Sequence, residues 1–197
     1  MSSGKRAARK AVVERLDREQ WLEAALSALA EGGVGEVRVE MLARRLRITK
    51  GSFYWHFKDR AALLEALSLR WQEGRVAAIA AQAAASGANG AAPALRLRRL
   101  LDLYLDHANP RGMAIELAMR DWARREPAAA AAVATVDKAR LAAITPLYEA
   151  LGHEPREATA RALALYAFIF GQSLIIEGAS AGKARELRDR CARLLIE

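Results

Sequence analysis

Apolar side chains recur along this chain with the three-to-four-residue spacing of an α-helix. Leu22, Ala25, Leu26 and Leu29 share one face of a first such segment, which Gly32 and Gly33 end. The next residues, VGEVRVE, alternate briefly between apolar and polar in the manner of a weak strand. We prefer a connecting loop here, because only seven residues show this period.

Prolines and glycines divide the rest of the pattern into further helices. A short helix is expected over Val39–Leu46, a third over Thr49–Phe57 and a long one from Asp59 toward Ala85. Proline at the first position of a helix then marks later starts. The ranges expected are about 94–108, 110–125, 127–151, 155–178 and 183–196, with Pro146 kinking the third of these. The sequence therefore predicts an all-α fold of about nine helices.

The charge of the chain points to a polyanionic partner. Its formal net charge is +8 and its pI is about 10.1. Residues 1–60 hold 13 Lys/Arg against 8 Asp/Glu, so most of the surplus is N-terminal. Net charge alone does not distinguish nucleic acid from an acidic membrane or an acidic protein as the partner. The distribution of charge indicates that the binding site lies near the N-terminus.

Several other classes of protein are disfavoured. The single cysteine, Cys191, excludes an intramolecular disulfide, and the apolar-rich run 162–176 has 15 residues where a membrane span needs about 20. No signal sequence is evident, so a soluble cytoplasmic protein is expected. No glycine-rich phosphate loop, nucleophile elbow or metal-ligand spacing appears. We therefore expect no catalysis, no cofactor and no metal.

One segment, VEMLARRLRITKGSFYWHF, has the spacing of a helix-turn-helix, the element that places a helix in the DNA major groove. Leu42, Leu46 and Ile48 are expected to pack against Phe53 and Phe57, which lie one turn apart. Gly51, Tyr54 and Trp55 then point elsewhere.

Each of these outward residues has a chemistry suited to DNA. Gly51 permits close approach of the backbone to a base edge, and Thr49 can cap the helix, whose free amides favour phosphate. Lys50 can reach guanine O6 or N7. Tyr54, Lys58 and Arg60 offer a hydroxyl and positive charges to phosphates.

At these residues the sequence resembles the tetracycline-repressor (TetR) family of transcriptional regulators. REQWLEAALSALAEGG resembles the first helix of that family, and ITKGSFYWHFKDRAALL resembles its recognition helix and the start of its fourth helix. The resemblance spans Arg18 to Leu64. It implies base contacts by Lys50 and Gly51, and phosphate contacts by Ser52, Tyr54, His56 and Arg60.

The domain organisation follows from this resemblance. We expect a basic flexible arm at 1–14, a three-helix DNA-binding domain at 15–64 with its helix-turn-helix at about 38–57, and a larger helical ligand-binding and dimerisation domain at 65–197. The residues expected to bind DNA are Thr49, Lys50, Gly51, Ser52, Tyr54, Trp55, His56, Lys58 and Arg60.

Two residues depart from the family pattern. Arg38 replaces the usual capping Ser or Thr, whose loss costs about 1 kcal/mol, and Arg47 stands where the turn often has Gly. Glu40 would repel phosphate unless it accepts a hydrogen bond from cytosine N4. Arg44, Arg47 and Glu40 are further candidate DNA contacts.

The C-terminal helices suggest dimerisation. The segment Ala158–Ile176 is apolar nearly all round, so it must be buried on two sides, against its own domain and against a partner subunit. The alternative is burial within one monomer. Candidate interface residues are Leu165, Ile169, Ile176, Leu187, Cys191 and Leu194.

The family resemblance also implies a small-molecule pocket in the larger domain. Candidate lining residues are Trp71, Tyr104, Met113, Leu117, Trp122, Tyr148, Phe168 and Gln172. The function expected is a homodimeric repressor that an unidentified small-molecule effector releases from an inverted-repeat operator in double-stranded DNA. The alternative is an α-helical small-molecule-binding or interaction protein without specific DNA binding.

Overall fold

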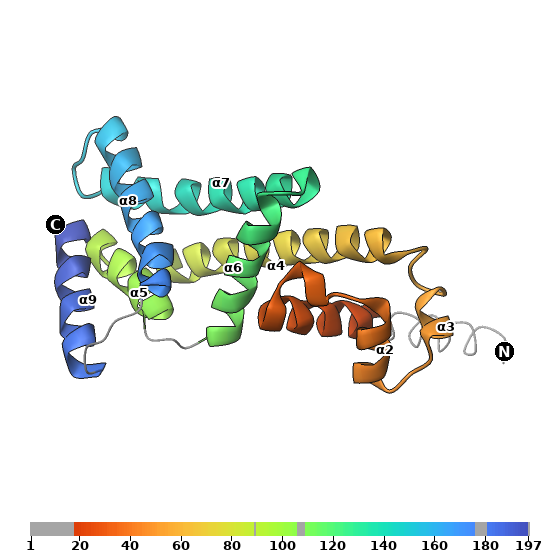
Figure 1. Ribbon diagram of the computed structural model, residues 1–197. Helices are drawn as coiled ribbons and strands as arrows, with labels where there is room; N and C mark the ends of the chain where they lie inside the picture. The colour runs from red at the N-terminus through yellow and green to blue at the C-terminus, as the bar shows by residue number, and fades with distance from the viewer. Residues whose placement is uncertain (1–17, 89, 106–108, 176–180, 197) are drawn as a thin grey trace, which may run out of the picture. The chain divides into compact units, whose positions relative to one another are not determined.

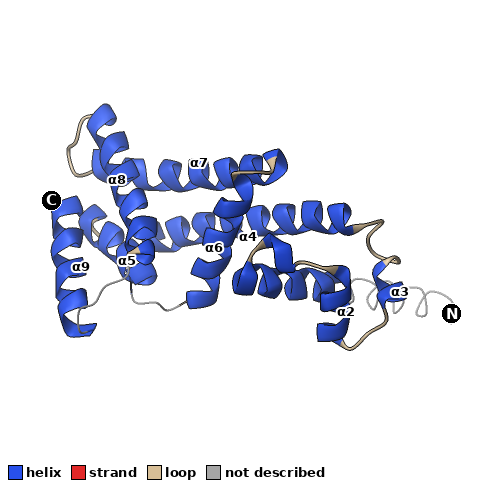
Figure 2. Ribbon diagram, viewed as in Figure 1, coloured by secondary structure: helices blue, strands red, loops and turns tan. Residues whose placement is uncertain are grey.

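The structure is a computed structural model that describes residues 18–88, 90–105, 109–175 and 181–196. The basic arm expected at 1–14 lies outside these residues. Within them the chain is helical and contains no strand (Figure 2). None of the helices searched in these residues is both long and apolar enough to cross a membrane.

The N-terminal elements agree with the predicted order (Figure 1). A helix over residues 18–32 is followed by a 3-10 turn, η1 (Val34–Glu36), in the segment expected to be a loop. Then come α2 (Val39–Leu46), α3 (Lys50–Phe53) and the long α4 (Arg60–Ala88).

The recognition helix is shorter than predicted. We expected it to extend to Phe57, whereas α3 ends at Phe53. From there the amides of Tyr54, Trp55 and His56 each bond to the carbonyl three residues earlier, at 3.2, 3.3 and 2.9 Å. This i to i−3 pattern is a tightened final turn, which commonly ends an α-helix.

The remaining helices are α5 (Pro93–Leu105), α6 (Pro110–Ala123), α7 (Pro127–Glu149), α8 (Pro155–Leu174) and α9 (Ala181–Ile196). Each starts within two residues of its predicted start. The described residues thus contain the nine α-helices expected. Helix α7 continues through Pro146 to Glu149.

The described residues cluster into two compact units. The first joins the chain up to Gly74 with Pro110–Thr135, and the second joins Arg75–Asn109 with Val136 onward. The sequence division at residue 64 does not coincide with this boundary, because α6 and the first half of α7 pack with the N-terminal helices.

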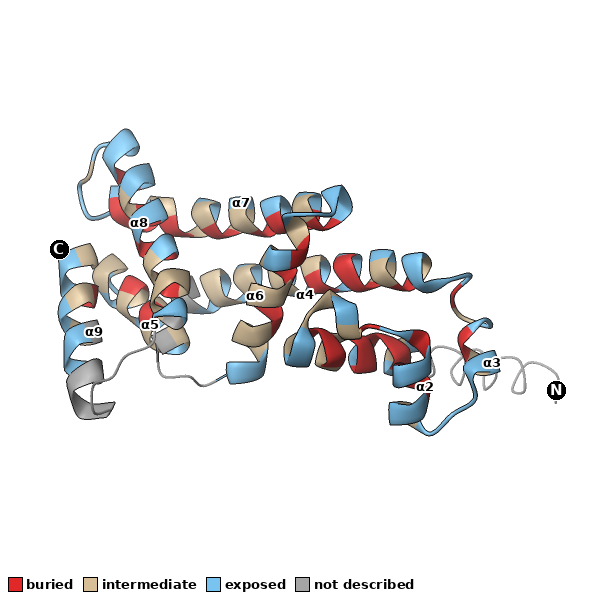
Figure 3. Ribbon diagram, viewed as in Figure 1, coloured by how far each residue is buried: buried red, intermediate tan, exposed pale blue. Residues whose placement is uncertain are grey.

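The first unit has many buried positions, drawn red in Figure 3, and they include an aromatic core. Trp21 and Phe53 are fully buried, and their rings meet edge to face with centroids 5.2 Å apart. Phe53 also stacks on Phe57 at 5.4 Å. Such pairs stabilise by about 0.5–1.5 kcal/mol beyond the burial of their area. On the surface of the same unit, Arg111 of α6 forms an ion pair with Glu23.

The second unit packs α5, α8 and α9 against one another. Tyr148 of α7 is fully buried there and donates a hydrogen bond of 2.8 Å to the carbonyl oxygen of Leu195 in α9. Burial raises the pKa of Tyr148 to about 12. Arg98 of α5 pairs with Asp102 on its own helix and with Asp189 of α9.

Candidate nucleic-acid interface

The turn between α2 and α3 is built around Arg47. This residue lies in the left-handed region, with φ 57° and ψ 37°, and it is the only non-glycine residue with a positive φ in the described part of the chain. A left-handed conformation costs a residue with a Cβ about 1–2 kcal/mol. The backbone conformation therefore explains why glycine suits this position, as the family pattern indicated.

The buried face of the motif is largely as predicted. Leu42, Phe53 and Phe57 are 1, 0 and 4% exposed. Leu46 is half-buried. Ile48 departs from the prediction, since 37% of its surface stays exposed. It lies in the turn, outside both helices, so it covers the core less than a helical residue would.

The opposite face carries exposed aromatic side chains. Tyr54 is 56% and Trp55 81% exposed, directly after the buried Phe53. Lys50, Gly51 and Lys58 are also exposed, whereas Ser52 and His56 are half-buried. The helix-turn-helix thus brings most of the predicted DNA contacts to one exposed segment.

Gly51 is not required by the packing of the protein itself. A Cβ at this position would meet only the Thr49 hydroxyl, at an ordinary contact distance of 3.8 Å. Its backbone is helical, so no positive φ demands glycine either. Close approach of a ligand to the backbone would still account for glycine at this position.

Two of the predicted DNA contacts bind each other. Lys50 of α3 forms an ion pair and hydrogen bond with Glu40 of α2. The hydrogen bond from Lys50 lowers the pKa of Glu40, and the same bond raises the pKa of Lys50. Both side chains stay about half exposed, at 49 and 62%. Sequence reasoning named both residues but missed this pairing, although opposite charges on the two helices of a tight motif could have suggested it.

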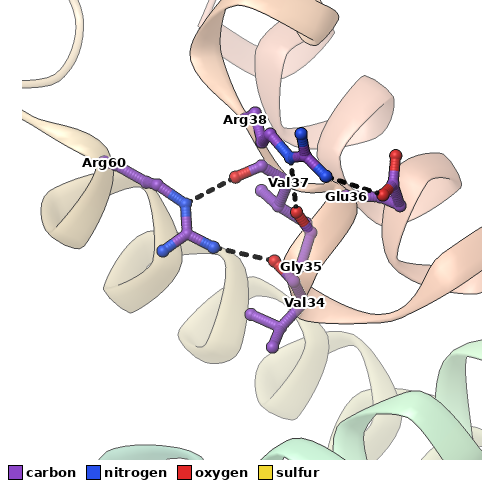
Figure 4. A network of polar contacts seen from close by, with 6 residues as sticks. All are labelled: Val34, Gly35, Glu36, Val37, Arg38 and Arg60. Carbon is purple, nitrogen blue, oxygen red and sulfur yellow. Dashed lines mark hydrogen bonds and ion pairs between the residues drawn. The ribbon is translucent and has the colours of Figure 1, made fainter.

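Arg60, predicted to contact phosphate, binds two backbone carbonyls of the protein itself (Figure 4). Its Nε donates to the carbonyl of Val37 and one terminal nitrogen donates to the carbonyl of Val34, both at 2.7 Å. These bonds hold the loop before α2 against the start of α4. Arg60 is therefore a positioning residue for the helix-turn-helix.

The helix caps also differ in detail from the expectations. Thr49 is the N-cap residue of α3 but makes no capping bond with its side chain, so that expectation was wrong. Arg38 occupies the N-cap of α2 without a side-chain cap, as anticipated. Its guanidinium instead donates to the carbonyl of Gly35 at 2.9 Å and pairs with Glu36 at 3.1 Å (Figure 4).

The other arginines of α2 and the turn divide into paired and exposed groups. Arg45 forms an ion pair with Glu31 of the preceding helix, a contact that sequence reasoning did not foresee. Arg44 and Arg47 are exposed. These two remain candidate DNA contacts.

The predicted ligand-pocket residues are not gathered at one place. Trp71, Met113, Leu117 and Trp122 belong to the first unit, where Trp71 and Trp122 are buried. A cavity lies in the second unit, among α4, α5, α7 and α8. Of the eight residues named from the sequence, Tyr104 lines it, whereas Tyr148, Phe168 and Gln172 belong to the same unit without lining it.

The predicted interface residues likewise divide. Leu165 and Ile169 are buried within the single chain, at 0 and 1% exposure, which is the alternative that the sequence left open. Leu187 and Leu194 of α9 are 56 and 79% exposed, and Cys191 between them is half-buried. Ile176 lies outside the described residues.

Comparison with known proteins identifies the N-terminal region. The family model described as bacterial regulatory proteins of the tetR family matches residues 22–67, which span the helix-turn-helix. The class D tetracycline repressor of Escherichia coli is 42% identical over 55 residues, 28% of this chain and 25% of that protein. The regulator TtgW of Pseudomonas putida is 33% identical over 61 residues, 30% of this chain and 46% of that protein. The match therefore spans about a quarter of the length of the tetracycline repressor.

Solved structures resemble the fold over nearly the whole chain. A transcriptional regulator from Rhodococcus covers 91% of this chain and 93% of its own, with a TM-score of 0.71 and 22% identity. The GusR protein of Salmonella enterica covers the same 91% and 93% of its own chain, with a TM-score of 0.66 and 19% identity. By this match, residues 22–67 form a domain of the tetR family of bacterial regulatory proteins, and the chain as a whole has the helical fold of the solved structures it resembles.

Proposed function

We propose that this chain is a homodimeric transcriptional repressor that binds an inverted-repeat operator and is released from it by a small molecule. The observation that carries the DNA-binding part is the exposure of Tyr54 and Trp55, 56 and 81%, beside the fully buried Phe53. Tyr54 packs one edge of its ring on Phe53, but folding gains little from leaving most of both aromatic side chains in water, so their exposure favours a role in binding. Lys50 and Gly51 lie on α3, directly before these two aromatic residues.

Positive charge supports a nucleic-acid partner. Arg44, Arg47 and Lys58 are exposed around this helix. Such side chains position a protein on DNA through phosphates, and we assign Tyr54 to the same role and Lys50 to a base edge. The name of the class D tetracycline repressor supports repression as the mode of regulation.

A dimer is favoured by apolar surface on the last two helices. Leu163 and Leu174 of α8, and Leu187 and Leu194 of α9, are each more than half exposed. Apolar stripes on two helices that pack together are suited to a two-fold interface of four helices. A symmetric dimer presents two recognition helices, which is why we expect an inverted repeat.

Ligand release is supported by the cavity of the second unit. A ligand that prefers one of two dimer arrangements needs to supply a coupling of only about 1–3 kcal/mol to change operator occupancy substantially.

The test is a selection of bound duplexes from a random DNA library with the purified chain at moderate salt. The same selection is repeated with Lys50→Ala and Tyr54→Ala combined, and with Lys138→Ala, an exposed lysine of the second unit, as the control. We expect an enriched inverted repeat with the original chain and the control, and none with the double variant. No enrichment with the original chain, or equal enrichment with the double variant, would overturn the proposed reading site.

A further inference from the structure

The cavity of the second unit has an unusual balance of charge for an apolar site. Its wall is mainly aliphatic, with Ile79, Leu100, Ile144 and Leu147 among its members, and it encloses about 570 Å³ when its open mouth is counted. Two arginines, Arg96 and Arg140, line it, and among the described residues no acidic side chain does. A ligand that fits this wall must be largely apolar, and any charge it carries is favoured to be negative.

Arg140 is already engaged within the protein. It is 4% exposed, and its Nη1 donates to the Tyr166 hydroxyl at 2.7 Å. That hydroxyl donates in turn to the carboxylate of Asp137 at 2.6 Å. The Arg140 guanidinium also lies 5.5 Å from the ring centres of Tyr166 and Phe170. Arg140 therefore belongs to a network that shapes one side of the cavity.

Arg96 has no such network. It is half-buried, and it forms no ion pair with any described residue. Its Nη2 makes one long hydrogen bond, 3.5 Å to the carbonyl of Ala83, and its Nε is buried without a hydrogen-bond partner. Arg98, two residues along the same helix, pairs with one carboxylate of α5 and one of α9, whereas Arg96 forms no such pair with a described residue.

A buried guanidinium nitrogen without an acceptor is costly, and a ligand carboxylate would remove that cost. Arginine presents two parallel N–H groups that match the two oxygens of a carboxylate. From this geometry we propose that the cavity binds an organic carboxylate with an apolar body, whose carboxylate is held by Arg96. The inference rests on the proposed function for its regulatory meaning, but the binding itself does not require DNA.

The experiment is direct calorimetric titration of the full chain, without DNA, using matched pairs of acid and amide. The probes are 1-naphthoate with 1-naphthamide, and octanoate with octanamide. We expect each carboxylate to bind at least about tenfold more tightly than its amide, the size expected for a charge-assisted hydrogen bond. This comparison uses the unaltered protein, so it does not depend on the folding of any variant.

The role of Arg96 is tested by Arg96→Gln, with Arg99→Gln as the control. Arg99 lies on the same helix, is exposed and does not line the cavity. We expect Arg96→Gln to remove the preference for carboxylate over amide and Arg99→Gln to keep it. Equal binding of acids and amides, binding of neither, or an unchanged preference in Arg96→Gln would overturn the proposal.

One further measurement separates this inference from the proposed function. The carboxylate that binds is added to the complex of the protein with its selected operator, and the change in operator affinity is measured. Carboxylate binding that leaves operator affinity unchanged would contradict ligand release while upholding the site. Operator binding by a chain that takes up no carboxylate would contradict the carboxylate site while upholding DNA binding.

Discussion

Lys50 and Glu40 form an ion pair that connects the recognition helix to the helix before it. Lysine at this position is expected to reach a guanine, so in the DNA complex it must exchange its carboxylate partner for a base. Glu40 is left beside the negative charge of the DNA backbone unless it accepts from cytosine N4. We therefore expect the pair to oppose binding to most DNA sequences.

Replacing Glu40 by Gln is expected to raise affinity for DNA in general and to lower discrimination between sequences. Because the ion pair is exposed and screened by solvent, we expect a modest increase, about two- to fivefold, for unrelated duplexes. Fluorescence anisotropy titrations with the selected operator and a scrambled duplex would measure it. The control is Glu73→Gln, an exposed carboxylate on α4. An unchanged ratio of the two affinities would contradict this role of Glu40.

Arg60 and Lys58 are expected to behave differently although both are positive and exposed. Arg60→Gln should lower the free energy of unfolding by about 1–3 kcal/mol, because two backbone carbonyls lose a charged donor. Lys58→Gln should leave stability unchanged. It should reduce the salt dependence of DNA affinity by the amount expected for the loss of about one phosphate contact. Urea unfolding followed by circular dichroism gives the first quantity. Equal stability of the two variants would show that Arg60 does not hold the loop.

Much of this architecture was predictable because its signals are local. Prolines fixed the starts of α6, α7 and α8, and the spacing of Phe53 and Phe57 identified the buried face of the motif. Such features depend on a few neighbouring residues.

The features that escaped prediction depend on residues distant in the sequence. The bonds of Arg60 reach carbonyls 23 and 26 residues earlier, and no periodicity reports the direction in which a guanidinium turns. The cavity is assembled from four helices, so an apolar residue such as Trp122 has the same pattern whether it packs in the core of the first unit or lines a pocket in the second. Likewise, helix periodicity cannot distinguish an apolar residue buried within the monomer, such as Leu165, from one that a partner subunit covers.

Arg47 offers a test of backbone strain in the turn. Arg47→Gly should raise the free energy of unfolding by about 1 kcal/mol relative to Arg47→Ala, because glycine has no Cβ to oppose a φ of 57°. Both variants remove the same charge, so their difference isolates the conformation. Urea unfolding of the two would measure it, and equal midpoints would argue against a left-handed residue here.

The raised pKa of Tyr148 predicts that the free energy of unfolding depends on pH in the alkaline range. Its pKa is raised to about 12 in the folded chain, against 10.0 ordinarily, so the folded state holds the phenol proton more tightly than the unfolded state. This contribution is complete below pH 10 and is lost as the pH rises toward 12. Tyr148→Phe should be less stable by about 1 kcal/mol at pH 8, where its hydrogen bond to Leu195 is lost. That deficit should shrink between pH 10 and 12 in denaturant titrations. The exposed Tyr54→Phe serves as the control, and a deficit independent of pH would contradict the assignment.

The proposed dimer depends on side chains that the monomer leaves in water. Leu187 and Leu194 are 56 and 79% exposed, so changing both to Arg removes little packing within the chain. Burial of these two side chains by a partner would stabilise the dimer by about 1.5–3 kcal/mol each, and a charge at either position would be desolvated instead. We expect Leu187→Arg with Leu194→Arg to sediment as a monomer at micromolar concentration, with the helical content of the original chain. Leu69→Arg, at a leucine of α4 in the first unit that is 51% exposed, should remain dimeric. A dimeric double variant would move the interface away from α9, and monomeric behaviour of the unaltered chain would refute the dimer itself.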